Sequence, residues 1–172
     1  PIFDPIYFVI RFLDLHVKYE KPTKNKTPFI ELEDNEQIYG ELAILKFLGG
    51  YFHLYPNKVK QDAAKVDIWL EHYLCFKNII SCKEYGLITE SESFSTIIVE
   101  YLDLFEDSIY GKEFIESFDS PTIADFCWLC LLEWIFEHDS FKDLTENKYN
   151  NTKVYMIGLN SYISSIEDDE ND

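Results

Sequence analysis

The sequence predicts a mainly helical α+β fold, with a small α/β lobe followed by a larger all-helical lobe. Three observations predict this order. Helix-like and strand-like segments alternate up to about residue 50, and the apolar spacing is helical almost throughout beyond residue 57. Within that second part, Thr122 and Asp125 mark a helix start. At 172 residues the chain can bury a substantial core, as one domain or as two small lobes.

The first lobe is expected to begin with a helix and a strand. Residues 5–15 carry apolar side chains at helical spacing, and a proline is tolerated in the first helical turn. Val17 and Tyr19 indicate a short strand. Phe29 to Glu33 alternates apolar and charged residues, which is typical of a half-buried strand.

A turn, a returning strand and a second helix should complete this lobe. Residues 34–36 form the expected turn, and residues 37–39 can return antiparallel to the strand before it. A helix is expected from Glu41, loosening or stopping at Gly49 and Gly50. Its expected buried stripe is Ala43, Ile44, Phe47, Leu48 and Tyr51.

The second lobe is expected to consist of helices after a linker at residues 51–57. Thr122 should cap a helix, with Asp125 accepting from the capping backbone in a capping box. A last helix is expected over about residues 152–166, before an acidic segment at 167–172 that is a solvated tail or the start of a linker. Two expected buried faces are Val66, Trp69, Leu70, Tyr73 and Ile80, and then Ile97, Ile98, Tyr101, Leu102, Phe105 and Ile109.

The charge of the chain excludes some partners. A formal net charge of −17 argues against direct nucleic-acid binding, which depends on lysine and arginine contacts to phosphate. The longest uncharged apolar run, Phe126 to Leu132, is far too short to span a bilayer. We therefore expect neither a nucleic-acid nor a membrane partner.

The cysteines favour a reducing compartment, so a cytoplasmic location is expected. Cys75, Cys82, Cys127 and Cys130 lie in apolar segments rather than in a loop-rich disulfide framework. Cys127 and Cys130 are spaced as in redox motifs, but we interpret them as buried core thiols because they follow the helix start by a turn or more. A zinc site at Cys127 and Cys130 would need two further ligands, such as Cys75 and Cys82, and nothing in the sequence brings these together, so we expect no metal.

The order of the elements resembles that of the glutathione transferases. The resemblance implies a shortened thioredoxin-like lobe at 1–50, a linker at 51–57, an all-helical lobe at 58–166 and a tail at 167–172. The residues that carry it are Thr27-Pro28-Phe29, which resembles the family's cis-proline segment, together with 33–48, Tyr51 to Pro56, Val66 to Glu71 and Thr122 to Phe126.

The same resemblance implies a degraded glutathione site at Thr27, Pro28, Gly40 and Glu41. The family's serine that binds the γ-glutamyl carboxylate aligns with Glu41, where like charges would cost on the order of 1 kcal/mol or more. Residues 1–5 offer no thiolate donor, and Asp4 would repel a thiolate. Tyr7 is the nearest candidate donor, although a core role fits it better. No catalytic residue and no cofactor are therefore expected.

The sequence thus predicts a non-catalytic interaction domain of the translation machinery. It is similar to transferase-like modules of aminoacyl-tRNA synthetases, synthetase-complex auxiliary proteins and the gamma subunit of elongation factor 1. The expected partner is another such domain, in a homo- or heterodimer. The candidate contact residues are Leu42, Leu45, Lys46, Asp62 and Lys65. The alternative is a divergent glutathione-dependent transferase or peroxidase, with glutathione as its cofactor.

Overall fold

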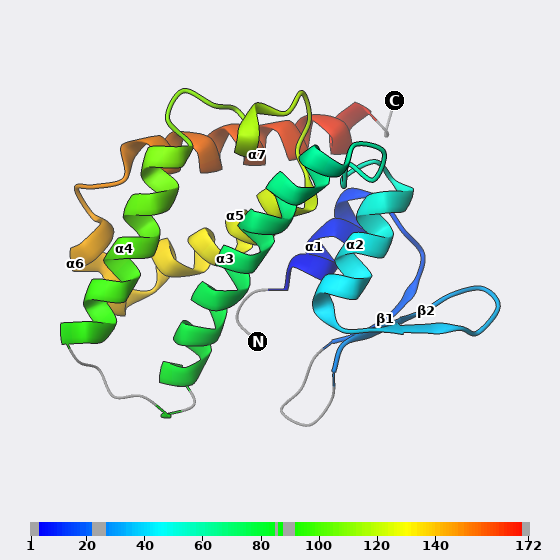
Figure 1. The fold of residues 1–172 in the computed structure, drawn as a ribbon, viewed down its shortest axis with the longest axis horizontal. Helices are drawn as coiled ribbons and strands as arrows, with labels where there is room; N and C mark the ends of the chain where they lie inside the picture. Colours follow the sequence, from blue (N-terminus) through cyan, green and yellow to red (C-terminus); the bar gives the residue numbers. More distant parts are fainter. Residues whose placement is uncertain (1–3, 22–26, 85, 88–91, 170–172) are drawn as a thin grey trace.

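The computed structural model describes residues 4–21, 27–84, 86–87 and 92–169. Figure 1 shows a small sheet at one end of the molecule, with α1 and α2 beside it and the other helices beyond them. In chain order the elements are α1 (Pro5–Phe12), β1 (Lys18–Glu20), β2 (Phe29–Glu31), β3 (Gln37–Tyr39), α2 (Glu41–Tyr51), α3 (Lys60–Glu84), α4 (Glu92–Ser108), η1 (Ile115–Ser117), α5 (Ile123–Glu137), η2 (Asp139–Phe141), α6 (Lys142–Thr145) and α7 (Asn150–Asp169).

The three strands form an antiparallel meander in the order β1-β2-β3, as the alternation of residues 29–39 predicts. Ile30 of the central strand is fully buried, pairing with Tyr19 on one side and Ile38 on the other. Asn35 closes the turn with a φ of 64°, a conformation that asparagine tolerates better than most residues. The sheet thus contributes one buried layer that packs against α2.

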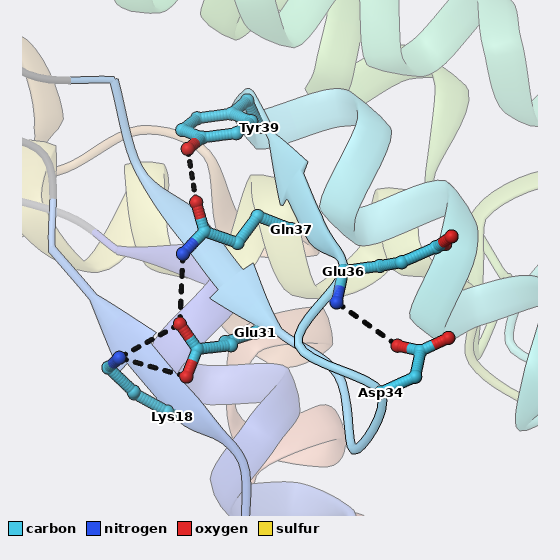
Figure 2. Close-up of polar contacts among 6 residues, drawn as sticks. All are labelled: Lys18, Glu31, Asp34, Glu36, Gln37 and Tyr39. Atoms are coloured by element: carbon cyan, nitrogen blue, oxygen red, sulfur yellow. Dashed lines mark hydrogen bonds and ion pairs between the residues drawn. The ribbon is translucent and has the colours of Figure 1, made fainter.

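A chain of polar contacts crosses the exposed face of the sheet. The Lys18 ammonium lies 2.9 Å from both carboxylate oxygens of Glu31. The Gln37 amide donates to Glu31 at 2.8 Å, and the Tyr39 hydroxyl donates to Gln37. Figure 2 shows these side chains spanning all three strands. These contacts lower the pKa of Glu31, so its charge is held by neighbours within the sheet.

Helix α2 buries a different face from the predicted one. Ile44, Leu45 and Leu48 are buried as a stripe, whereas Phe47 is 38% and Tyr51 72% exposed. Ala43 is exposed too, so three of the five predicted stripe residues face outward.

Helix α2 also continues through the two glycines at which it was expected to stop. Gly49 is needed for packing: a Cβ there would lie 2.7 Å from Cγ2 of Ile123 and 3.0 Å from Cβ of Tyr55. The backbone of α2 therefore approaches the start of α5 more closely than any side chain would allow.

Helix α5 is the centre of the helical part. Every residue from Pro121 to Leu132 is buried, and a helix that is buried all round belongs in a core. The predicted cap is confirmed, since the Asp125 carboxylate accepts from the Thr122 backbone N–H at 2.7 Å and its hydroxyl at 2.9 Å. It also accepts from the Ile115 N–H at 2.8 Å and the Tyr155 hydroxyl at 2.9 Å. Asp125 therefore connects the start of α5 to Ile115 of η1 and to Tyr155 of α7.

Aromatic rings fill the space between α3, α4 and α5. The Trp128 indole N–H donates to the Trp69 carbonyl at 3.0 Å, and the two ring centroids lie 5.8 Å apart. Phe105 of α4 stacks on Trp128 at 4.6 Å. The predicted α3 face is confirmed, because all five of its residues are buried. In the α4 face, Ile97 and Tyr101 are only half-buried.

Helix α7 begins against α4. The Glu106 carboxylate accepts from the backbone N–H groups of Asn151 and Thr152 at 2.9 and 2.8 Å, and from the Thr152 hydroxyl at 2.7 Å. Helix α7 runs to Asp169, so it includes part of the segment predicted as a tail, and residues 170–172 lie outside the described residues. Within the described part, no helix combines the length and apolarity needed to cross a membrane.

Candidate functional site

A polar cluster forms where the first turn of α2 meets α3. The Glu41 carboxylate, at the first position of α2, accepts from the Tyr73 hydroxyl at 3.1 Å and makes an ion pair with Lys77. Tyr73 and Lys77 are four residues apart on α3, so both project from the same side of that helix. The Lys77 and Glu41 side chains retain 20% and 14% exposure, which leaves the pair accessible from solvent.

A second carboxylate lies at the start of α1. Asp4 is the N-cap of this helix and accepts from the Tyr7 backbone N–H at 3.1 Å. The Tyr19 hydroxyl of β1 donates to both Asp4 oxygens, at 2.8 and 3.0 Å. Burial, then this hydrogen bond and the charges of Asp4 and Glu41, raise the pKa of Tyr19, so its hydroxyl stays protonated at physiological pH.

Two thiols of α5 lie within the electrostatic reach of this cluster. Burial raises the pKa of Cys127 and of Cys130, and the charge of Glu41 adds to both shifts. Both cysteines are free and buried, with Cys130 8% exposed. Because the thiolate is the nucleophilic form, these thiols are poorly suited to attack a substrate. Their burial agrees with the interpretation as core residues.

Three of the four residues predicted for the degraded glutathione site lie together. The Gly40 N–H donates to the Pro28 carbonyl at 2.9 Å, and Glu41 follows Gly40 at the start of α2. Gly40 has a φ of 92°, which explains a glycine at the cap better than any ligand contact does. Thr27 is exposed, and the expected cis-proline is wrong, because among the described residues all peptide bonds, including Thr27–Pro28, are trans.

The predicted contact residues differ in their availability. Leu45 is fully buried in the core and is unavailable to a partner, because the face of α2 was misassigned. Leu42 is half-buried. Lys46 pairs with Asp67 at 2.9 Å, and Lys65 with Asp62 at 3.5 Å. The charged members are therefore partnered within the chain.

Sequence reasoning missed Tyr19, Tyr73 and Lys77. Tyr73 was assigned to the core, where it lies, but its hydroxyl also reaches Glu41. No sequence-based expectation involves Lys77. The available signal was the four-residue spacing of Tyr73 and Lys77 on a predicted helix, which places a donor and a cation on one side.

The arrangement places one cation, Lys77, and one protonated hydroxyl, Tyr19, beside the carboxylates of Glu41 and Asp4. Lys77 offsets the Glu41 charge, and Tyr19 supplies a hydroxyl that remains protonated. The like-charge repulsion predicted at Glu41 is therefore smaller than the sequence implied, since a cation from α3 lies against it.

Solved structures with the same architecture were found, although no family model and no curated protein matches the sequence. A glutathione transferase of Bombyx mori has 16% identity and a TM-score of 0.69, covering 96% of this chain and 85% of its own. A glutathione transferase of Methylococcus capsulatus has 15% identity and a TM-score of 0.65, with 95% and 93% covered. Glutathione S-transferase 1-6 of Anopheles dirus has 16% identity and a TM-score of 0.63, with 94% and 96% covered.

These likenesses correct the predicted function. A non-catalytic assembly domain of the translation machinery was expected, but the matched structures are glutathione transferases, and none of the three is a translation component. The prediction rested on the altered residues at positions 40 and 41, which concern one site and do not identify a translation component. The described residues, a small three-stranded sheet with seven α-helices, have the glutathione transferase fold.

Proposed function

We propose that this chain is a divergent glutathione-dependent transferase. The observation that carries the proposal is the likeness to glutathione transferases over 94 to 96% of the chain. The proposed reaction is attack of the glutathione sulfur on an electrophilic carbon. A carbon–sulfur bond forms, the leaving group departs with its bonding electrons, and the thiol proton passes to solvent.

The cluster at the start of α2 supports binding of the γ-glutamyl end of glutathione. The resemblance places the contact with the γ-glutamyl carboxylate at position 41. Glu41 cannot attract a carboxylate, but the neighbouring Lys77 supplies a positive charge at this place. Charge-assisted contacts between an ammonium and a carboxylate are about twice as strong as neutral hydrogen bonds. In this proposal Lys77 binds the carboxylate, and Glu41 competes with that carboxylate for the Lys77 ammonium.

The start of α1 supports the thiol end of the same ligand. A helix N-terminus favours an anion, and the Tyr19 hydroxyl is a protonated donor beside it. Asp4 opposes a thiolate at this place, which fits a slow transferase. Tyr19→Phe should therefore reduce turnover more than it weakens glutathione binding.

The decisive experiment removes each charge of the Glu41–Lys77 ion pair in a separate variant. Lys77→Met removes the cation and should raise the KM for glutathione by roughly tenfold, whereas Glu41→Gln removes the opposing anion and should lower it. Lys60→Met, an exposed lysine on the same helix, is the matched control and should change neither. Turnover of 1-chloro-2,4-dinitrobenzene and calorimetric binding of glutathione give the two readouts.

The outcomes separate a binding role from a structural one. If Lys77→Met acts only by destabilising the fold, the double variant with Glu41→Gln should restore both stability and glutathione affinity, whereas in a binding role stability returns and affinity does not. Failure of the unaltered protein to bind glutathione at millimolar concentration would sink the proposal.

We further propose that two copies of this chain pair through Leu42, Lys46, Asp62 and Lys65. Leu42 offers partly exposed apolar surface, and the three charged residues come from α2 and from the first two turns of α3, which the Lys46–Asp67 ion pair connects. Sedimentation velocity at increasing concentration tests this pairing. Leu42→Glu should shift the protein towards monomer, and a monomer at every concentration before substitution would rule it out.

A further inference from the structure

A groove of 630 Å³ lies where the end of the sheet meets the C-terminal end of α2, away from the polar cluster described above. Residues 15–18, residues 30–34 and residues 47–52 contribute to its walls. Its volume falls in the range of roughly 300–1,000 Å³ that is usual for ligand sites. Neither the fold nor the proposed transferase reaction accounts for it.

One wall of the groove is aromatic and exposed. The rings of Phe47 and Tyr51 stack with centroids 6.4 Å apart, and Phe52 meets Tyr51 edge-on at 5.0 Å. Tyr51 is 72% and Phe47 38% exposed. These are the residues of α2 that the apolar pattern assigned to the core, and neither is covered by the described part of the chain.

Another part of the lining is acidic. Glu31 is already engaged by Lys18 and Gln37, as Figure 2 shows. The next acidic residues, Glu33 and Asp34, are both exposed, and Asp34 accepts one backbone hydrogen bond, from the Glu36 N–H at 3.1 Å.

The other titratable groups that face the groove do not reverse its charge. His16 is exposed on the segment before β1, and the Lys18 charge is offset by Glu31. Three carboxylates against one lysine leave the walls with a net negative charge, as the whole chain has at −17.

We propose that this groove binds an extended basic segment of a partner protein. Its lysine or arginine side chains lie over the faces of Tyr51 and Phe47, where a cation within about 6 Å of a ring centroid is attracted. Their charges point to Glu33 and Asp34, and the apolar stems of the same side chains cover the aromatic surface. Charge complementarity selects this occupant over an acidic peptide or a nucleic acid, and the inference does not depend on transferase activity.

Fluorescence anisotropy of a labelled short peptide of alternating lysine and leucine tests the proposal, with glutamate in place of lysine as the control peptide. The basic peptide should bind and the acidic one should not. Tyr51→Ala should weaken binding roughly threefold or more, and Glu33→Gln with Asp34→Asn by a similar factor at low salt.

Matched substitutions elsewhere separate this groove from general attraction to an acidic protein. Tyr110→Ala removes a ring that is 75% exposed, and Glu100→Gln with Asp107→Asn removes two exposed charges from α4, which lies at the opposite end of Figure 1 from the sheet. These controls should leave peptide binding within a factor of about two. Equal loss in both sets, no binding of the basic peptide, or self-association that Tyr51→Ala abolishes would each overturn the proposal.

Discussion

Asp4 occupies the place where a helix start would otherwise favour an anion. Its carboxylate caps α1 through the Tyr7 N–H and accepts from Tyr19. Asparagine caps helices about as well as aspartate, so Asp4→Asn can remove the charge while keeping the cap.

We predict that Asp4→Asn raises kcat/KM for glutathione by roughly three- to tenfold, because the start of α1 then favours a thiolate. Ultraviolet absorbance of bound thiolate against pH should show a lower pKa for the glutathione thiol. Asp107→Asn, which removes an exposed charge from α4, is the control. A fall in kcat/KM with Asp4→Asn would contradict this account of α1.

At the scale of single residues, the sequence predicts contacts between residues that are close along the chain, and it misses contacts between residues that are far apart along the chain. The cap of Asp125 on Thr122 spans three residues, so its spacing alone identifies it. The pairing of Glu41 with Lys77 spans 36 residues and depends on how α2 packs against α3, which no local pattern contains. From the sequence alone Glu41 is therefore a carboxylate without the lysine that pairs with it in the structure.

Among the elements, α2 shows where apolar periodicity stops being informative. Six of the seven residues from Leu42 to Leu48 are apolar, so more than one stripe satisfies helical spacing. The chosen stripe included Phe47 and Tyr51, and tertiary packing buried Leu45 and Gly49 instead. The strands and the α3 face were predictable because charged residues interrupt their apolar positions.

Gly49→Ala should destabilise the protein by about 1–3 kcal/mol, because the added methyl group overlaps Ile123. Gly50→Ala is a close control in the same helix, where the nearest atom is the Asn57 amide nitrogen at 3.5 Å. This second change should be neutral or stabilising by up to about 1 kcal/mol. Urea unfolding followed by circular dichroism measures both, and equal effects would refute the close approach of α2 to α5.

The junction of α4 and α7 should carry a measurable pH dependence. Burial raises the pKa of Glu106, but hydrogen bonds from Asn151 and Thr152 outweigh it and hold the pKa below its ordinary value. A lowered folded-state pKa gives stability that is present above the unfolded-state pKa and is lost as the pH falls through the folded-state one.

Glu106→Gln should therefore cost about 1 kcal/mol at neutral pH, with allowance made for the partial exposure of this side chain. The difference in unfolding free energy between the two proteins should disappear as the pH falls below about 4. Urea midpoints across that range provide the measurement. If the difference in stability between the two proteins did not change with pH, the stability lost in Glu106→Gln would come from the shape of the side chain rather than from its charge.

At the scale of the whole molecule, the net charge should affect the two proposed sites in opposite ways: it opposes glutathione binding and favours binding of a basic peptide. Glutathione is an anion, and a chain of charge −17 repels it at long range. Raising the salt from about 20 to about 200 mM shortens the screening length from roughly 21 to 7 Å.

We therefore predict that the KM for glutathione falls by roughly two- to fivefold over that range of salt, while binding of the basic peptide to the groove weakens. Steady-state kinetics and anisotropy in the same buffers measure the two slopes. A KM that rises with salt would show that local attraction at Lys77 outweighs the charge of the whole chain.

The contact between Trp69 and Trp128 gives the protein a spectroscopic label of its own. Two indole rings 5.8 Å apart and inclined at 76° are close enough for their electronic transitions to couple. One ring comes from α3 and the other from α5, so the coupling exists only while these helices are packed together. A near-ultraviolet circular dichroism couplet should therefore disappear when α3 and α5 separate, even where helical content survives, and the chain can report loss of its core without any attached dye.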